Sequence, residues 1–89
     1  MRCVITVVGK DTVGILSRVS SICAENSINI IEVTQSILQD MFCMIMLVDL
    51  KDSKTAFSDF EDMLTDAGKR EGLVIHAMRK DIFESMHKI

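Results

Sequence analysis

The sequence predicts one α+β domain with the element order βαββαβ, in which two helices cover one face of an antiparallel sheet. Three observations support this prediction. Apolar residues change from the alternation of a strand to the 3.6-residue period of a helix and back again along the chain. The chain has 89 residues, 48% of them hydrophobic, which suffices for one modest core. The run 41–48 is continuously apolar, which is typical of a central strand.

The first two elements are a strand and a helix joined by a tight polar turn. Residues 2–8 alternate between two faces and form the first predicted strand. An apolar helical period begins at Gly14 and ends near Asn26, which predicts an amphipathic helix. We expect Asp11 or Thr12 to be the N-cap of this helix.

A hairpin follows the first helix. Residues 29–38 form the second predicted strand, and residues 39–40 form a short turn. Residues 41–49 form the third strand, which we expect in the middle of the sheet because both of its faces are apolar. One face of the second strand is expected to hold three apolar residues, Ile31, Val33 and Ile37.

The second half of the chain repeats the pattern of helix and strand. Ser53 is the expected N-cap of the second helix, and Gly68 is its expected end. Residues 73–79 form the fourth predicted strand, and residues 81–89 form a short amphipathic tail helix. The apolar stripe of the second helix comprises Ala56, Phe57, Phe60, Met63, Leu64 and Ala67.

Right-handed crossovers then give the sheet order 4-1-3-2, with antiparallel neighbours and both helices on one face. This is the ferredoxin-like sandwich, here with a short C-terminal helix. We expect residues 1–89 to be a single domain with a core over 2–80 and a tail helix over 81–89. One sheet face carries no helix, and the second strand is a long open edge. These two features predict a homo-oligomer, with a dimer as the expected form.

Composition excludes several classes of partner. The net charge is −3 and the chain has neither Trp nor Tyr, so we expect no direct binding of nucleic acid. The apolar run 41–48 is too short to cross a membrane. The N-terminus has the pattern of a strand and not of a secretory leader, so the expected location is the cytoplasm.

Cysteine and histidine side chains show no spacing that indicates catalysis or metal binding. Cys3, Cys23 and Cys43 each lie in an apolar pattern and are expected to be buried, reduced thiols. His76 and His87 are expected to be packing or surface residues. The sequence therefore predicts no catalytic residue, no metal site and no cofactor.

Other functions of the same fold fit poorly. Metal carriers of this fold need paired cysteines in the first loop, and the loop 9–14 has none. RNA-binding modules need aromatic side chains on the first and third strands, where only Phe42 is aromatic. A phosphate-binding P-loop needs Lys and then Ser or Thr after its last glycine, but Ile15 and Leu16 follow Gly14.

An acylphosphatase-like hydrolase is a distant alternative. The segment 14–18 places an arginine four residues after a glycine at the helix start, as that enzyme does. The water-orienting asparagine of acylphosphatase belongs in the second strand, where this chain has Glu32, Thr34 and Gln35. Asp11 would also repel a bound phosphate.

The junction of the first strand and first helix is the strongest candidate for a binding site. The β-branched run ends at Gly9, and the helix begins at Gly14. A helix N-terminus presents unpaired backbone N–H groups and the positive end of the helix dipole. Such a junction is suited to an anionic group such as a carboxylate.

This junction resembles the signature of the ACT domain, a small amino-acid-binding regulatory module. The usual form is Asp-x-Pro-Gly-x-[Leu/Ile]-x-x-[Ile/Val], then a helix, then x-Asn-Ile. This chain matches it at 11–19 and 28–30, except that Val13 replaces the usual proline. The ending 82–89 resembles that of a family of uncharacterised stand-alone ACT proteins. The resemblance implies a non-enzymatic regulatory module that signals to a metabolic enzyme or transcription regulator.

The resemblance also implies a ligand, an amino acid, between the first loop and the start of the second strand, at a dimer seam. Backbone N–H groups near Gly14 would face the ligand carboxylate. Asp11 would accept from its ammonium group, and Asn29 would bind either end. A plain structural role, in which Asp11 caps the helix and Asn29 shapes a turn, stays open, as does a ligand-free dimerisation protein. The expected ligand-binding residues are Asp11, Thr12, Val13, Gly14, Ile15, Asn29 and Ile30.

Overall fold

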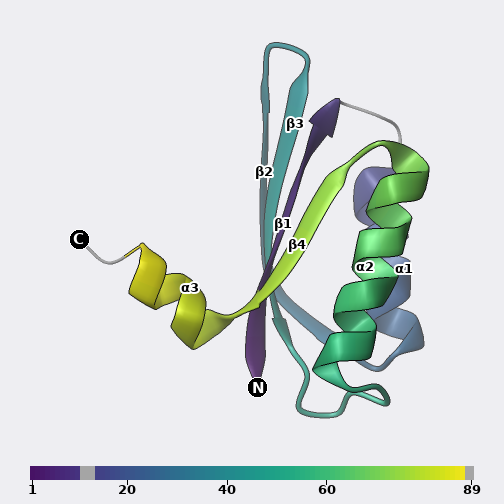
Figure 1. The fold of residues 1–89 in the computed structure, drawn as a ribbon, viewed down its shortest axis with the longest axis vertical. Coiled ribbons are helices and arrows are strands. Elements are labelled where there is room, and N and C mark those ends of the chain that lie inside the picture. The colour runs from purple at the N-terminus through teal and green to yellow at the C-terminus, as the bar shows by residue number, and fades with distance from the viewer. Residues whose placement is uncertain (11–13, 88–89) are drawn as a thin grey trace.

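The computed structural model describes residues 1–10 and 14–87 of the chain. Figure 1 shows the predicted order βαββαβ, followed by a short C-terminal helix. The elements are β1 (Arg2–Lys10), α1 (Ile15–Glu25), β2 (Asn29–Leu38), β3 (Met41–Asp49), α2 (Phe57–Glu71), β4 (Val74–Arg79) and α3 (Lys80–Met86).

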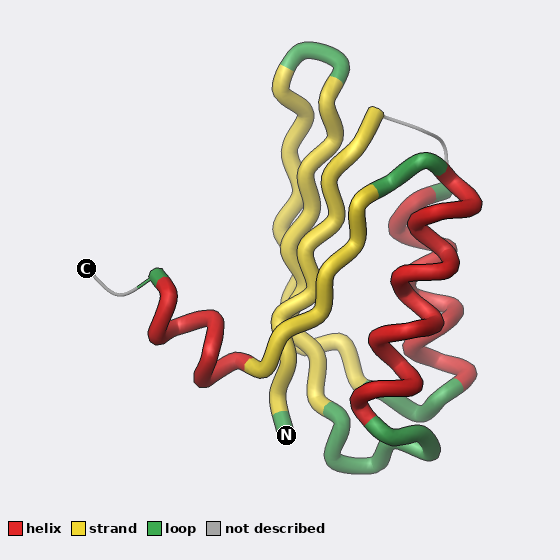
Figure 2. Tube along the Cα trace, in the orientation of Figure 1, coloured by secondary structure: helices red, strands yellow, loops and turns green. Residues whose placement is uncertain are grey.

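The four strands form one sheet in the order β2-β3-β1-β4, and all neighbouring strands are antiparallel. This order confirms the predicted ferredoxin-like sandwich and the central position of β3. Figure 2 shows α1 and α2 together on one side of the sheet, while α3 projects on the other side. The sheet therefore has one face covered by two helices and one largely open face.

The core lies between the sheet and the two long helices. Alternate residues of β1 and β3 face the helices, so Ile5 is paired with Met46 and both are fully buried. Phe60 is fully buried and fixes α2 to the sheet as predicted, whereas Phe57 packs only partly against the core. The fully or almost fully buried core side chains include Cys3, Val7, Val19, Cys23, Met44, Val48 and Leu64.

A β-bulge in β2 changes which side chains face the core. Ile30 pairs with Val48, but the next regular pair joins Glu32 to Leu47, so one extra residue lies between them. Ile30 therefore packs against the core, and Ile31 is 38% exposed. The prediction that Ile31 shares one face of β2 with Val33 and Ile37 is wrong, because the bulge interrupts the alternation that it assumed.

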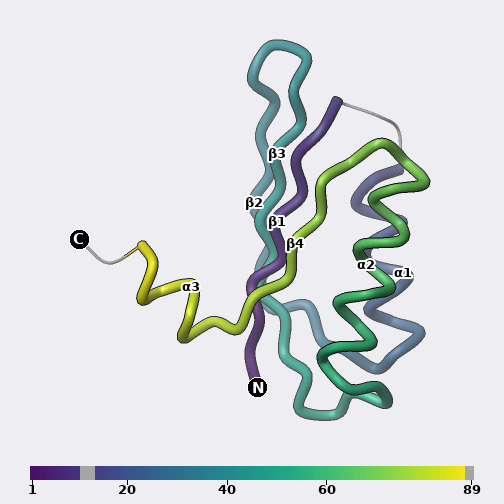
Figure 3. Tube along the Cα trace, viewed as in Figure 1, coloured from purple at the N-terminus to yellow at the C-terminus, as the bar shows by residue number. Residues whose placement is uncertain are grey.

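The far end of β2 also lies outside the core. Val33 packs against the core as predicted, but Ile37 is 57% exposed although it lies on the same side of the strand. Figure 3 shows that the β2–β3 hairpin extends beyond the ends of both long helices. Ile37 stays exposed because no helix reaches that part of the sheet.

The first helix begins later than its expected cap. Gly14 occupies the N-cap position of α1, in a left-handed conformation with φ 86°, instead of Asp11 or Thr12. Glycine adopts this conformation without a steric penalty, so the backbone turn itself starts the helix. At the other end, Asn26 is the C-cap, and Ser27 takes the left-handed conformation with φ 57°.

The second helix differs from its predicted bounds at both ends. Ala56 is the N-cap, because the Ser53 hydroxyl is used in a local turn, where it accepts from the Thr55 amide at 3.1 Å. Gly68 lies inside α2 and is buried, and the helix ends at Gly72, which has φ 70°. Glycine at 72 provides the left-handed C-terminal turn that the prediction assigned to Gly68.

The C-terminal helix lies against the open face of the sheet beside β1 and β4. Phe83 is half-buried, and its ring stacks on that of His87 at a centroid distance of 4.2 Å. Both rings line a cavity of about 230 Å³ with His76, which is an exposed strand residue as expected. Of the predicted amphipathic positions, Ile89 lies outside the described residues, while Ile82 and Met86 are exposed.

Candidate functional site

The predicted first-loop site begins where α1 begins. Gly14 and Ile15 are described, whereas 11–13, with Asp11, Thr12 and Val13, lies outside the described residues. The first backbone hydrogen bond of the helix runs from the Arg18 amide to the Gly14 carbonyl oxygen at 2.9 Å. The amides of residues 15–17 precede this bond, as at any helix N-terminus.

Asn29 and Ile30, the other predicted ligand-binding residues, lie at the opposite end of the sheet. Asn29 pairs with Asp49, which pairs with Arg2 at the start of β1. The first loop follows Lys10 at the end of β1, and a strand of this length spans about 30 Å. One protomer alone therefore does not bring Asn29 next to the first loop.

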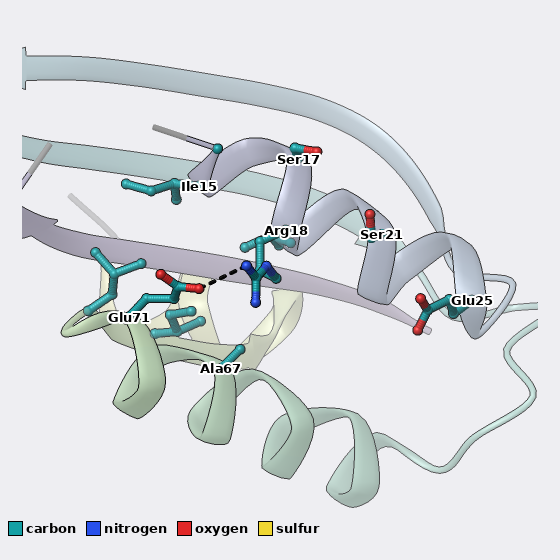
Figure 4. A pocket seen from close by; sticks show the side chains of 11 residues that line it. Ile15, Ser17, Arg18, Ser21, Glu25, Ala67 and Glu71 are labelled. Atoms are coloured by element: carbon teal, nitrogen blue, oxygen red, sulfur yellow. Dashed lines mark ion pairs between the residues drawn. The ribbon is translucent and has the colours of Figure 1, made fainter. Parts of the chain in front are cut away.

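A cavity of about 420 Å³ lies between α1 and α2, and Gly14 and Ile15 are among its lining residues. Figure 4 shows α1 and α2 on either side of it. The volume is at the lower end of the usual range for small-molecule sites, about 300–1,000 Å³. The floor is apolar and consists of Ile15, Val19, Ala67, Leu73 and Ile75, which are all buried.

The rim of the cavity is polar and carries charges of both signs. The Arg18 guanidinium (Nη2) forms an ion pair with Glu71 Oε1 at 3.0 Å, and this pair joins α1 to α2 (Figure 4). Both side chains are partly accessible, at 55% and 36%. Ser17, Ser21 and Glu25 follow one another at intervals of four residues and complete the rim along α1.

The sequence did not predict this cavity. Arg18 was considered only as the arginine of an acylphosphatase-like enzyme, and Glu71 was not singled out. The spacing of Ser17, Ser21 and Glu25 was a signal for one polar face on α1. That this face and Glu71 line one cavity is a result of how α1 and α2 pack on the sheet, which the spacing within α1 does not show.

The two buried thiols, Cys3 and Cys23, are poor nucleophiles. Burial raises the pKa of Cys3 and the pKa of Cys23 to about 11, so both stay protonated near neutral pH. Cys43 is only half-buried, contrary to the expectation of a buried thiol, and lies on the open face of the sheet. Among residues 1–10 and 14–87, no three His, Cys, Asp or Glu side chains form a group that could hold a metal ion.

The fold and the junction at Gly14 define the class of this protein, a small ferredoxin-like module with a cavity beside its first helix. The sequence profile of the ACT domain matches residues 2–78, and the chain belongs to the ACT domain family. This match confirms the resemblance found at 11–19 and 28–30. ACT domains are regulatory ligand-binding modules.

Known relatives agree with this assignment. A UPF0237 protein of Clostridium acetobutylicum is 45% identical over 89 residues, which are 100% of both chains. The structure of an ACT domain protein from Streptococcus pneumoniae has a TM-score of 0.81 at 34% identity, covering 94% of each chain. A structure described as a glycine cleavage system transcriptional repressor has a TM-score of 0.75 at 26% identity, covering 89% of this chain and 45% of that one.

The lengths and polarities of the helices bear on whether the chain can cross a membrane. In the part of the chain that the structure describes, the helices are too short or too polar to span a membrane.

Proposed function

We propose that this chain is a non-enzymatic regulatory module that binds an amino acid at a homodimer interface. Ligand binding would pass a signal to a metabolic enzyme or transcription regulator. The transcriptional repressor noted above contains the same fold within a longer chain, which supports a partner of this kind. The observation that carries the proposal is the open edge of β2.

The edge of β2 can pair with a second copy of itself. Beyond the bulge, the segment 32–38 keeps a regular register with β3, and most of its side chains are exposed. An edge of this length with unpaired backbone groups is a template for a further strand. Two copies of β2 related by a two-fold axis would pair in an antiparallel manner.

This pairing would unite the two halves of the predicted site. Leu38 pairs with Met41, which pairs with Lys10, so the end of β2 lies at the same end of the sheet as the first loop. In an antiparallel β2–β2 pair, the start of β2 in one protomer lies beside the end of β2 in the other. Asn29 of one protomer is thereby brought toward the first loop of its partner.

The chemistry of the united site fits an amino acid. The backbone amides at the start of α1 would face its carboxylate, with Gly14 allowing close approach because it has no Cβ. Asp11 would accept a hydrogen bond from its ammonium group, and Asn29 of the other protomer can donate or accept. Thr12, Val13, Ile15 and Ile30 would complete the contact surface.

The acylphosphatase alternative receives little support. Its arginine would need to be available to a phosphate, whereas the Arg18 guanidinium is 3.0 Å from the Glu71 carboxylate. An anion at this distance competes with a bound phosphate.

Thermal unfolding with a panel of amino acids at millimolar concentration tests the proposal. A ligand at one hundred times its Kd stabilises the folded state by about 2.7 kcal/mol, which raises Tm by about 10–20 °C in a domain of this size. Asp11→Ala and Asn29→Ala are expected to abolish the shift that arises from the interface site and to keep the Tm of the unliganded protein. Asp52→Ala and Asp66→Ala, which change exposed positions outside β2 and the first loop, are the controls and are expected to keep the shift.

If no amino acid or small carboxylate raises the Tm of the wild type, ligand sensing is wrong. A dimerisation module without a ligand would then be the better description. Sedimentation of the same sample distinguishes this outcome from a failure to dimerise.

A further inference from the structure

We propose that the cavity between α1 and α2 is a second amino-acid site, complete within one protomer and selective for an apolar side chain. Arg18 would bind the carboxylate and Glu71 the ammonium group. This inference goes beyond the interface site, because it requires neither Asp11 nor Asn29 nor a partner subunit.

The charges on the rim match a zwitterion. An α-amino acid carries a carboxylate and an ammonium group on one carbon atom, so its two charges are close together. Arg18 and Glu71 present the complementary charges side by side, with 3.0 Å between Nη2 and Oε1. A simple carboxylic acid would meet the Glu71 carboxylate as a like charge, and a simple amine would meet the Arg18 guanidinium.

The ion pair leaves binding capacity on both side chains. A guanidinium has five N–H donors, and the contact with Glu71 uses only Nη2. Oε1 of Glu71 receives that contact, which leaves Oε2 for an ammonium group. Because both side chains are partly exposed, the pair contributes little to stability and can adjust to a ligand at small cost.

The rest of the rim is also available to a ligand. The neighbouring Ser20 hydroxyl already donates to the Leu16 carbonyl oxygen. Ser17 and Ser21, by contrast, make no side-chain hydrogen bond to any residue that the structure describes. Figure 4 shows these hydroxyl groups along α1, on the side of the helix away from Glu71.

The floor and the far end of the cavity determine which amino acid fits. The floor residues Val19, Ala67 and Ile75 are buried and apolar, so they favour an aliphatic side chain. Glu25 lines the end of the cavity away from Glu71 (Figure 4) and would repel an acidic side chain. Leucine and its isosteres are therefore the preferred ligands, and glutamate and aspartate are disfavoured.

Isothermal titration calorimetry with L-leucine tests this site in the full chain. We expect saturable binding at one leucine per protomer in the variant Asn29→Ala, which lacks the interface site. In that background, Arg18→Gln and Glu71→Gln are each expected to weaken binding at least tenfold. Arg79→Gln is the matched control, because it removes a comparably exposed ion pair, with Asp81 at 3.1 Å, far from the cavity.

A second measurement uses analogues of leucine and needs no substitution of a residue that lines the cavity. 4-Methylpentanoate lacks the ammonium group of leucine, and 3-methylbutylamine lacks the carboxylate. Each is expected to bind at least tenfold more weakly than leucine, and glutamate is expected to bind more weakly than leucine.

The outcomes separate this site from the interface site. If Asn29→Ala loses all leucine binding while Arg18→Gln in the wild-type background keeps it, the cavity is not an amino-acid site and the interface proposal stands. If, in the Asn29→Ala background, Arg18→Gln binds leucine as tightly as Arg79→Gln does, the second site is likewise disproved. Loss of binding in Arg18→Gln alone, with Asn29→Ala unaffected, supports the cavity and counts against the interface.

Discussion

Gly68 in α2 and Leu73, the residue before β4, bring the helix and the strand into close backbone contact. The Leu73 amide donates a hydrogen bond of 2.8 Å to the Gly68 carbonyl oxygen. A β-carbon on Gly68 would lie 2.8 Å from the Leu73 carbonyl oxygen and 3.2 Å from Ile75 Cγ1. The last turns of α2 can approach the sheet this closely because residue 68 has no side chain.

Gly68→Ala is therefore expected to destabilise the fold, although alanine is the better helix former by about 1 kcal/mol. The new β-carbon meets a backbone atom, so helix and strand must separate, at a net cost of about 1–3 kcal/mol. Urea unfolding measures this loss. Asp66→Ala, at an exposed position of the same helix, is the control and should change stability by less than about 0.5 kcal/mol.

Phe60 should dominate the contribution of α2 to stability. Phe60→Ala removes a fully buried ring and is expected to cost about 3–5 kcal/mol. Phe57→Ala removes a partly buried ring from the same helix and is expected to cost about 1 kcal/mol. Equal losses in urea unfolding would show that the helix packs differently.

The protein is expected to sediment as a dimer at micromolar concentration, because β2 presents an open edge. Ile45→Lys places a charge on the open face of the sheet, where Ile45 is 47% exposed. If the dimer forms through the β2 edges, this variant stays dimeric. A monomeric Ile45→Lys would show that the open faces pack together instead, and a monomeric wild type would disprove the dimer.

Stability is expected to fall in alkaline solution because of the buried thiols. The pKa of Cys23 is about 11 in the folded state and about 9 in an exposed thiol, so the folded state holds its proton where the unfolded state releases it. This contribution is complete below pH 9 and is lost as the pH rises from 9 through 11. At pH 10.5 the loss should be about 1–2 kcal/mol for this residue.

Unfolding of the wild type and of Cys23→Ala at pH 8 and 10.5 isolates this effect, because the variant lacks the titrating group. The stability difference between the two proteins should shrink at the higher pH. A difference that does not change with pH would contradict the assigned burial.

The sequence by itself determined the order of the elements and the topology of the sheet. The continuous apolar run of β3 indicated a strand between two neighbours, and the period of α2 identified Phe60 and Leu64 as core residues. The motif around Gly14 placed the chain in its family. These features depend on residues close together in the chain, where periodicity and turn chemistry are directly visible.

Only the tertiary structure decided the exact ends of the helices, the bulge beside Ile31, and the cavity between α1 and α2. The bulge is a mismatch between two paired strands, so neither strand shows it alone. Arg18 and Glu71 each look like ordinary exposed residues of a helix. They meet because both helices pack on the same face of one sheet, and that arrangement depends on contacts between distant parts of the chain.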